Sequence, residues 1–65
     1  MKLDVNRIYL LKHDIRLAGG INGRTVVPEG TMVKVLYWDE AIADCEVRDG
    51  ALDGLTFATS PAYLE

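Results

Sequence analysis

The sequence predicts an all-β fold, a small antiparallel barrel, on three observations. The chain has 65 residues, of which 49% are hydrophobic and 26% charged, a globular composition with room for one domain. Turn-forming groups recur at intervals too short for long helices: Gly19-Gly20, Asn22-Gly23, Pro28-Glu29-Gly30, Asp49-Gly50 and Asp53-Gly54. Between them, apolar and polar residues alternate with the period of a strand. We therefore expect residues 1–65 to form a single domain of about five short strands with a C-terminal 3-10 turn.

The first part of the chain predicts a strand and a long loop. Residues 7–11 form the strand, which resumes over residues 15–17. An apolar stripe at helical spacing also runs through this stretch, but it ends weakly before Gly19-Gly20, so a strand is favoured over a helix. Residues 18–30 then form a glycine-rich loop, in which residues 25–27 return in an extended conformation.

The centre of the chain predicts a hairpin. Residues 31–38 form the best strand, because β-branched and aromatic residues dominate it. One face carries Val33, Val35 and Tyr37, and the other carries Met32, Lys34, Leu36 and Trp38. Residues 41–47 form the next strand, with small apolar residues alternating with Ile42 and acidic residues. Asp39 and Glu40 separate the runs and predict a tight turn, which can borrow Trp38 or Ala41 because neither Asp39 nor Glu40 is glycine.

The last segment predicts a short strand and one helical turn. Residues 54–59 form the strand. Ser60 is a good N-cap and Pro61 suits the first helical position, so a single turn follows. Such a short turn needs tertiary packing, and we expect Tyr63 or Leu64 to supply it.

Charge is distributed unevenly along the chain. Residues 1–38 carry six basic and three acidic residues, a net +3, and residues 39–65 carry one basic and seven acidic residues, a net −6. This reads either as solvated strand faces and turns or as an acidic face that meets a basic partner. Both interpretations disfavour binding to nucleic acid, which requires a basic surface.

Other features bear on location. No run approaches the ~20 apolar residues of a membrane span, so we expect no membrane partner. Asn6 and Arg7 interrupt the start before an apolar signal-peptide core can form. A single cysteine, Cys45, agrees with a reducing compartment. We expect a cytoplasmic protein.

Three stretches, residues 28–36, 41–47 and 60–65, resemble the SH3-like small β-barrels. The ending Ser60-Pro61-Ala62-Tyr63-Leu64-Glu65 is similar to the Pro-x-x-Tyr-aliphatic ending of SH3 domains, one residue shorter between Pro and Tyr. The Ala-Leu-Tyr-Asp-Tyr opening and the paired tryptophans of eukaryotic SH3 domains are absent, so the resemblance does not imply polyproline binding. It is closer to bacterial SH3-like domains, which implies an accessory or assembly module.

The candidate binding residues combine aromatic and acidic side chains. Tryptophan and tyrosine are favoured binding anchors because each has a large rigid surface with a polar tip. The predicted partner-binding surface consists of Tyr37, Trp38, Asp39, Glu40, Pro61 and Tyr63. Two roles remain open for Trp38, since its ring could either close one end of the core or be exposed for recognition.

No motif predicts a catalytic, metal or cofactor site. His13 and Asp14 are neighbours, but no nucleophile accompanies them in a recognisable motif. Cys45 falls on the small apolar face, where a buried, unreactive thiol is expected. The acidic residues of the hairpin lack the spacing of a calcium loop, and residues 19–23 lack the features of a phosphate loop.

These observations favour a non-enzymatic protein-interaction or assembly module. It would bind a protein partner or itself, so a homo-oligomer is one possible state. The alternative is a small accessory subunit, or an inhibitor of the phage or plasmid type, that blocks a nucleic-acid enzyme by acidic mimicry. An enzyme whose active site forms only across an oligomer is the third and weakest hypothesis.

Overall fold

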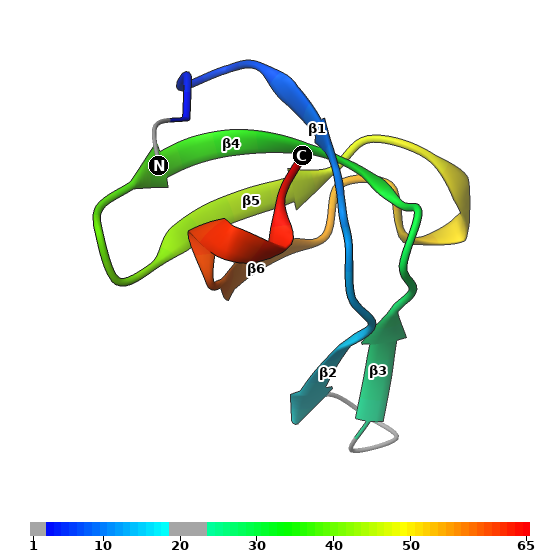
Figure 1. Cartoon of the computed structure of the whole chain (residues 1–65). Helices are drawn as coiled ribbons and strands as arrows, with labels where there is room; N and C mark the ends of the chain where they lie inside the picture. Colours follow the sequence, from blue (N-terminus) through cyan, green and yellow to red (C-terminus); the bar gives the residue numbers. More distant parts are fainter. Residues whose placement is uncertain (1–2, 19–23) are drawn as a thin grey trace.

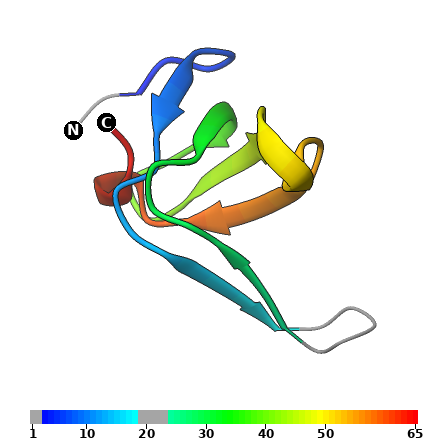
Figure 2. The ribbon, with the colours of Figure 1, turned by 90° about the vertical axis from the view of Figure 1, so that its right-hand side faces the viewer.

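Two antiparallel sheets build the part of the chain that the structure, a computed structural model, describes: residues 3–18 and 24–65 (Figure 1). One sheet has four strands in the order β1 (Ile8–Leu10), β4 (Met32–Trp38), β5 (Ala43–Val47) and β6 (Thr56–Thr59). The other pairs β2 (Ile15–Ala18) with β3 (Arg24–Val27) in a ribbon that projects from the first sheet (Figure 2). Two 3-10 turns, η1 (Gly50–Leu52) and η2 (Pro61–Tyr63), complete the described elements.

The predicted all-β fold, its antiparallel pairing and its C-terminal 3-10 turn are confirmed. Residues 8–10 and 15–18 are strands, which excludes the helical alternative for this stretch. The described residues contain six strands, because the expected extended return is itself a strand, β3, paired with β2. The predicted strand over residues 54–59 begins only at Thr56, after Gly54 takes a φ of 92° in the turn that follows η1.

The core lies on the buried face of the four-stranded sheet, is joined by Val27 of β3, and consists mainly of aliphatic side chains. Alternate residues of β4 and β5 point inward, as expected for strands with one buried face. The buried hydrophobic residues are Leu3, Leu11, Val27, Val33, Val35, Ala43, Cys45, Val47, Phe57 and Leu64. The predicted burial of Cys45 is confirmed.

A β-bulge at Leu36 reverses the inward and outward alternation along β4. Val35 lies opposite Cys45 and Tyr37 lies opposite Asp44, so Leu36 is the extra residue. The prediction that Tyr37 shares a face with Val33 and Val35 is wrong, since its side chain is 55% exposed. Trp38 turns inward instead and packs against the core.

The loop between β4 and β5 has four residues, 39–42, because it includes Ala41, as the prediction allowed, and also Ile42. Asp39 closes the loop with its own side chain. Its Oδ1 accepts hydrogen bonds from the backbone N–H groups of Ala41 and Ile42, at 2.8 and 3.0 Å. The Asp39 backbone N–H also donates to the Ile42 carbonyl at 2.8 Å, so β5 begins at Ala43 and not at Ala41.

The C-terminal segment returns to β1 and pairs with it. Leu10 and Glu65 exchange backbone hydrogen bonds of 2.7 and 3.0 Å, and the Lys12 N–H donates to the Tyr63 carbonyl at 2.7 Å. Leu64, one of the two expected anchors, is buried and forms a bridge with Leu11. Tyr63, the other, stays 36% exposed. Residues 10–12 therefore have β4 on one side and the C-terminal segment on the other.

The curled four-stranded sheet and the ribbon remain two sheets through the described residues, and no closed barrel can be traced among them. The predicted glycine-rich turn over residues 19–23 lies outside the described residues. Within residues 3–18 and 24–65, no helix has the length and apolar character needed to cross a membrane.

Candidate functional site

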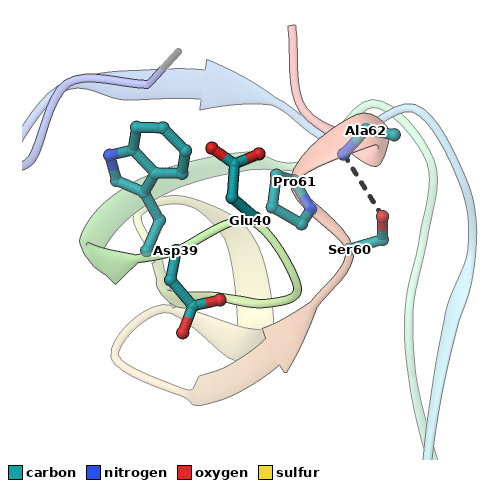
Figure 3. A pocket seen from close by; sticks show the side chains of 6 residues that line it. Asp39, Glu40, Ser60, Pro61 and Ala62 are labelled. Carbon is teal, nitrogen blue, oxygen red and sulfur yellow. Dashed lines mark hydrogen bonds between the residues drawn. The ribbon is translucent and has the colours of Figure 1, made fainter. Parts of the chain in front are cut away.

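A shallow pocket of about 140 Å³ lies between the loop after β4 and the turn η2 (Figure 3). Six residues line it, three from each segment: Trp38, Asp39, Glu40, Ser60, Pro61 and Ala62. Strand pairing brings the two segments together, because Trp38 lies opposite Ala43 and Ala43 lies opposite Thr59. The residues just beyond Trp38 and Thr59 therefore meet at the same end of the sheet.

Trp38 contributes to both the core and the pocket. The bulge at Leu36 directs its side chain to the inner face, opposite the small side chain of Ala43. The indole is half-buried and packs against the core while it also lines the pocket. The side chain is thus partly in the core and partly accessible at the pocket.

Asp39 and Glu40 differ in how their carboxylates are used. The Asp39 carboxylate is occupied by the two backbone bonds that close the loop. Glu40 is exposed, and its carboxylate makes no hydrogen bond or ion pair with any residue in the described part of the chain. Figure 3 shows the Glu40 side chain next to Pro61, with the Asp39 carboxylate directed away from it. Glu40 is therefore the pocket carboxylate that has no hydrogen-bond or ion-pair partner within the described residues.

Ser60 and Pro61 form the opposite wall. The Ser60 Oγ accepts a hydrogen bond from the Ala62 N–H at 3.3 Å and caps η2 (Figure 3), as predicted. Pro61 occupies the first helical position and is buried. This capping fixes a rigid apolar wall opposite Trp38.

The structure brings four of the six predicted binding residues together: Trp38, Asp39, Glu40 and Pro61. Tyr37 lies on the outer face of β4, and the Tyr63 ring packs on His13 with the ring centroids 4.2 Å apart and the planes at 37°. Neither tyrosine lines the pocket. Sequence reasoning named Ser60 only as a cap and missed Ala62 as a lining residue. The sequence signal for Ser60 and Ala62 as lining residues was their position on either side of Pro61.

Two other side chains considered for chemistry, Cys45 and Asp14, lie outside the pocket lining. Burial, with a smaller contribution from the neighbouring Asp44 carboxylate, raises the pKa of the Cys45 thiol to about 11, which keeps it protonated and unreactive at neutral pH. The Asp14 carboxylate accepts a hydrogen bond from the Glu29 N–H at 2.7 Å and helps to fix the return of the long loop. Among the described residues, no three His, Cys, Asp or Glu side chains lie close enough to hold a metal ion.

Comparison of the chain with protein-family models, curated proteins and solved structures gave no match. The interpretation of the pocket therefore depends on its own geometry and charge.

Proposed function

We propose that this chain is a non-enzymatic protein-interaction module that binds a partner protein at the pocket between Trp38 and Pro61. The observation that carries the proposal is the Glu40 carboxylate, which lies beside two apolar walls with no partner of its own in the described part of the chain. A half-buried tryptophan is a typical binding anchor, because its large rigid surface is already ordered before binding.

The size and charge of the pocket indicate the chemistry of the partner. Pockets for small-molecule ligands have volumes of about 300–1,000 Å³. The present pocket, at about 140 Å³, has room for one side chain rather than for a cofactor. We infer that it takes an aliphatic side chain of the partner, with a neighbouring lysine or arginine on Glu40. Such a contact at an exposed rim is sensitive to salt.

We also propose that the fold is SH3-like. Three features support this: a long excursion carrying β2 and β3, a hairpin of β4 and β5, and a 3-10 turn followed by a C-terminal return to β1. The pocket lies between the hairpin loop and that 3-10 turn.

Acidic mimicry of nucleic acid is less well supported by the arrangement of charges. A mimic needs a continuous row of carboxylates. Glu46 is paired with Arg48 at 3.2 Å, and Lys34 lies directly opposite Glu46 on β4. The acidic half of the sequence is therefore interrupted by basic residues on the sheet.

The test compares three versions of the chain as baits in affinity capture followed by mass spectrometry. The wild type and the Asp53→Lys variant should retain the partner, and Glu40→Lys should lose it. Asp53→Lys makes the same change of charge on an exposed residue outside the pocket lining, so it controls for net charge. NMR titration with the captured partner should then shift the Trp38 indole and Ala62 amide signals. Equal capture by Glu40→Lys, with shifts elsewhere on the surface, would rule out this site.

A further inference from the structure

A second surface lies at β6, which is the last strand of the four-stranded sheet. β5 pairs with one side of β6, and no backbone hydrogen bond within the described residues joins its other side to the rest of the chain. An unpaired strand edge presents N–H and C=O groups to which another strand can bind.

The hydrogen-bond pattern between β5 and β6 shows which backbone N–H and C=O groups of β6 are not paired with β5. Val47 donates to the Leu55 carbonyl and accepts from the Gly54 N–H, both at 2.8 Å, so Val47 bonds toward the β6 side. In an antiparallel pair the bonding direction alternates along each strand. Cys45 lies two residues before Val47, so its backbone groups also point toward β6. Phe57 lies opposite Cys45, and its backbone N–H and C=O groups therefore point toward β5. The backbone N–H and C=O groups of Thr56 and Ala58 therefore point away from β5, along the free edge.

The outer face beside this edge is hollowed and carries one carboxylate. The hollow, about 410 Å³, is lined by Leu36, Asp44, Thr56, Phe57 and Ala58. Leu36 is 39% exposed because the bulge leaves it without an opposite residue on β5. Asp44 lies directly opposite Ala58 and makes no ion pair among the described residues. Since Ala58 is small, the Asp44 carboxylate can be approached across it from the edge.

We propose that the edge of β6 binds an extended segment of a partner protein as an added strand, with a lysine or arginine opposite Ala58. Two strand spacings, roughly 9–10 Å, separate an added strand from β5. A long basic side chain lying across Ala58 spans this gap, with its aliphatic part on Ala58 and its charged end on Asp44. Charge complementarity thus selects a basic segment, and the free backbone groups of Thr56 and Ala58 select an extended one.

This surface is distinct from the proposed pocket. Asp44, Thr56 and Ala58 face outward from the sheet, whereas Trp38 packs against the inner side. The test is therefore made in a Glu40→Gln background, which removes the pocket carboxylate. Failure at one surface then leaves the result at the other unaffected.

The probe is the peptide Ac-Val-Lys-Val-Lys-Val-NH2, titrated into the ¹⁵N-labelled chain and followed by NMR. We expect shifts and slower amide exchange at Thr56 and Ala58, and no binding of the corresponding Val-Glu peptide. Asp44→Asn should weaken binding by roughly two- to fivefold, since it removes one partner of an exposed ion pair. Asp53→Asn, the matched control, should leave binding unchanged. A probe with N-methylated backbone amides should bind far less well if the main chain carries the contact.

Ala58→Pro gives an independent readout of the edge. Proline is tolerated on an edge strand where its missing N–H faces solvent, so this variant should fold and yet fail to bind the probe. Equal binding of the N-methylated probe, or full affinity of both Asp44→Asn and Ala58→Pro, would overturn the proposal. So would a concentration-dependent dimer in light scattering that Ala58→Pro abolishes, because a second copy of the chain would then occupy the edge.

Discussion

Replacing Leu64 by alanine should remove a large share of the stability of the folded chain. Leu64 is 5% exposed and bridges to Leu11, which is fully buried. A buried leucine-to-alanine change costs about 2–5 kcal/mol, since it loses apolar burial and leaves a cavity. A folded chain of 65 residues has a total stability of roughly 3–10 kcal/mol. A loss of about 3 kcal/mol would lower the unfolding midpoint by roughly 12–24 °C.

Thermal and urea unfolding, followed by circular dichroism and Trp38 fluorescence, measure this change. The control is Glu65→Gln, which removes only the exposed ion pair with Lys12 at 3.0 Å and should cost about 0–1 kcal/mol. The two positions are adjacent, so the comparison separates core packing from surface charge within one segment. If Leu64→Ala costs no more than Glu65→Gln, the C-terminal segment does not hold the core together as described.

Two further changes test the hairpin loop and the buried thiol. Asp39→Ala should lower the free energy of unfolding by about 1 kcal/mol, because two loop hydrogen bonds lose their acceptor. In the same urea titration, Glu40→Gln should change it by no more than about 0.5 kcal/mol. Similar values for both variants would contradict the conclusion that Asp39, and not Glu40, closes the loop. The free energy of unfolding should fall as the pH rises from 9.0 toward about 11, because the Cys45 thiol ionises first in the unfolded chain. Urea titrations across this pH range should show a shallower fall for Cys45→Ala than for the wild type. An identical fall in both would refute the conclusion that burial raises the pKa of this thiol.

The strands were predictable from the sequence because their signal is local. Alternation and β-branched residues place Val33 and Val35 inward without any knowledge of the partner strands. The bulge at Leu36 was not predictable in this way. The sequence around it contains no glycine to mark an irregularity, and the bulge is defined only by the pairing with β5. The error at Tyr37 follows directly from the extra residue, Leu36, which shifts the alternation along β4 by one position.

The candidate pocket was predictable in four of its six lining residues but not in its geometry. The sequence named Trp38, Glu40 and Pro61 as binding residues because of their side-chain chemistry. It could not show that the register from Trp38 through Ala43 to Thr59 places them at one end of the sheet, since that is a long-range property. Nor could it show which carboxylate is free. Asp39 and Glu40 look equivalent in sequence, and only the closed loop shows that Asp39 is occupied.

The bulge links the core to both proposed binding surfaces, and this decides which residues can be changed to test them. One extra residue at Leu36 turns Trp38 inward and leaves Leu36 exposed on the outer face. A change at Trp38 would therefore disturb the core and the pocket together, and loss of binding would have two explanations. Glu40 and Asp44 are both exposed, and neither supports the core or makes an ion pair among the described residues. Charge changes at these two positions can separate binding at the pocket from binding at the β6 edge while the fold stays intact.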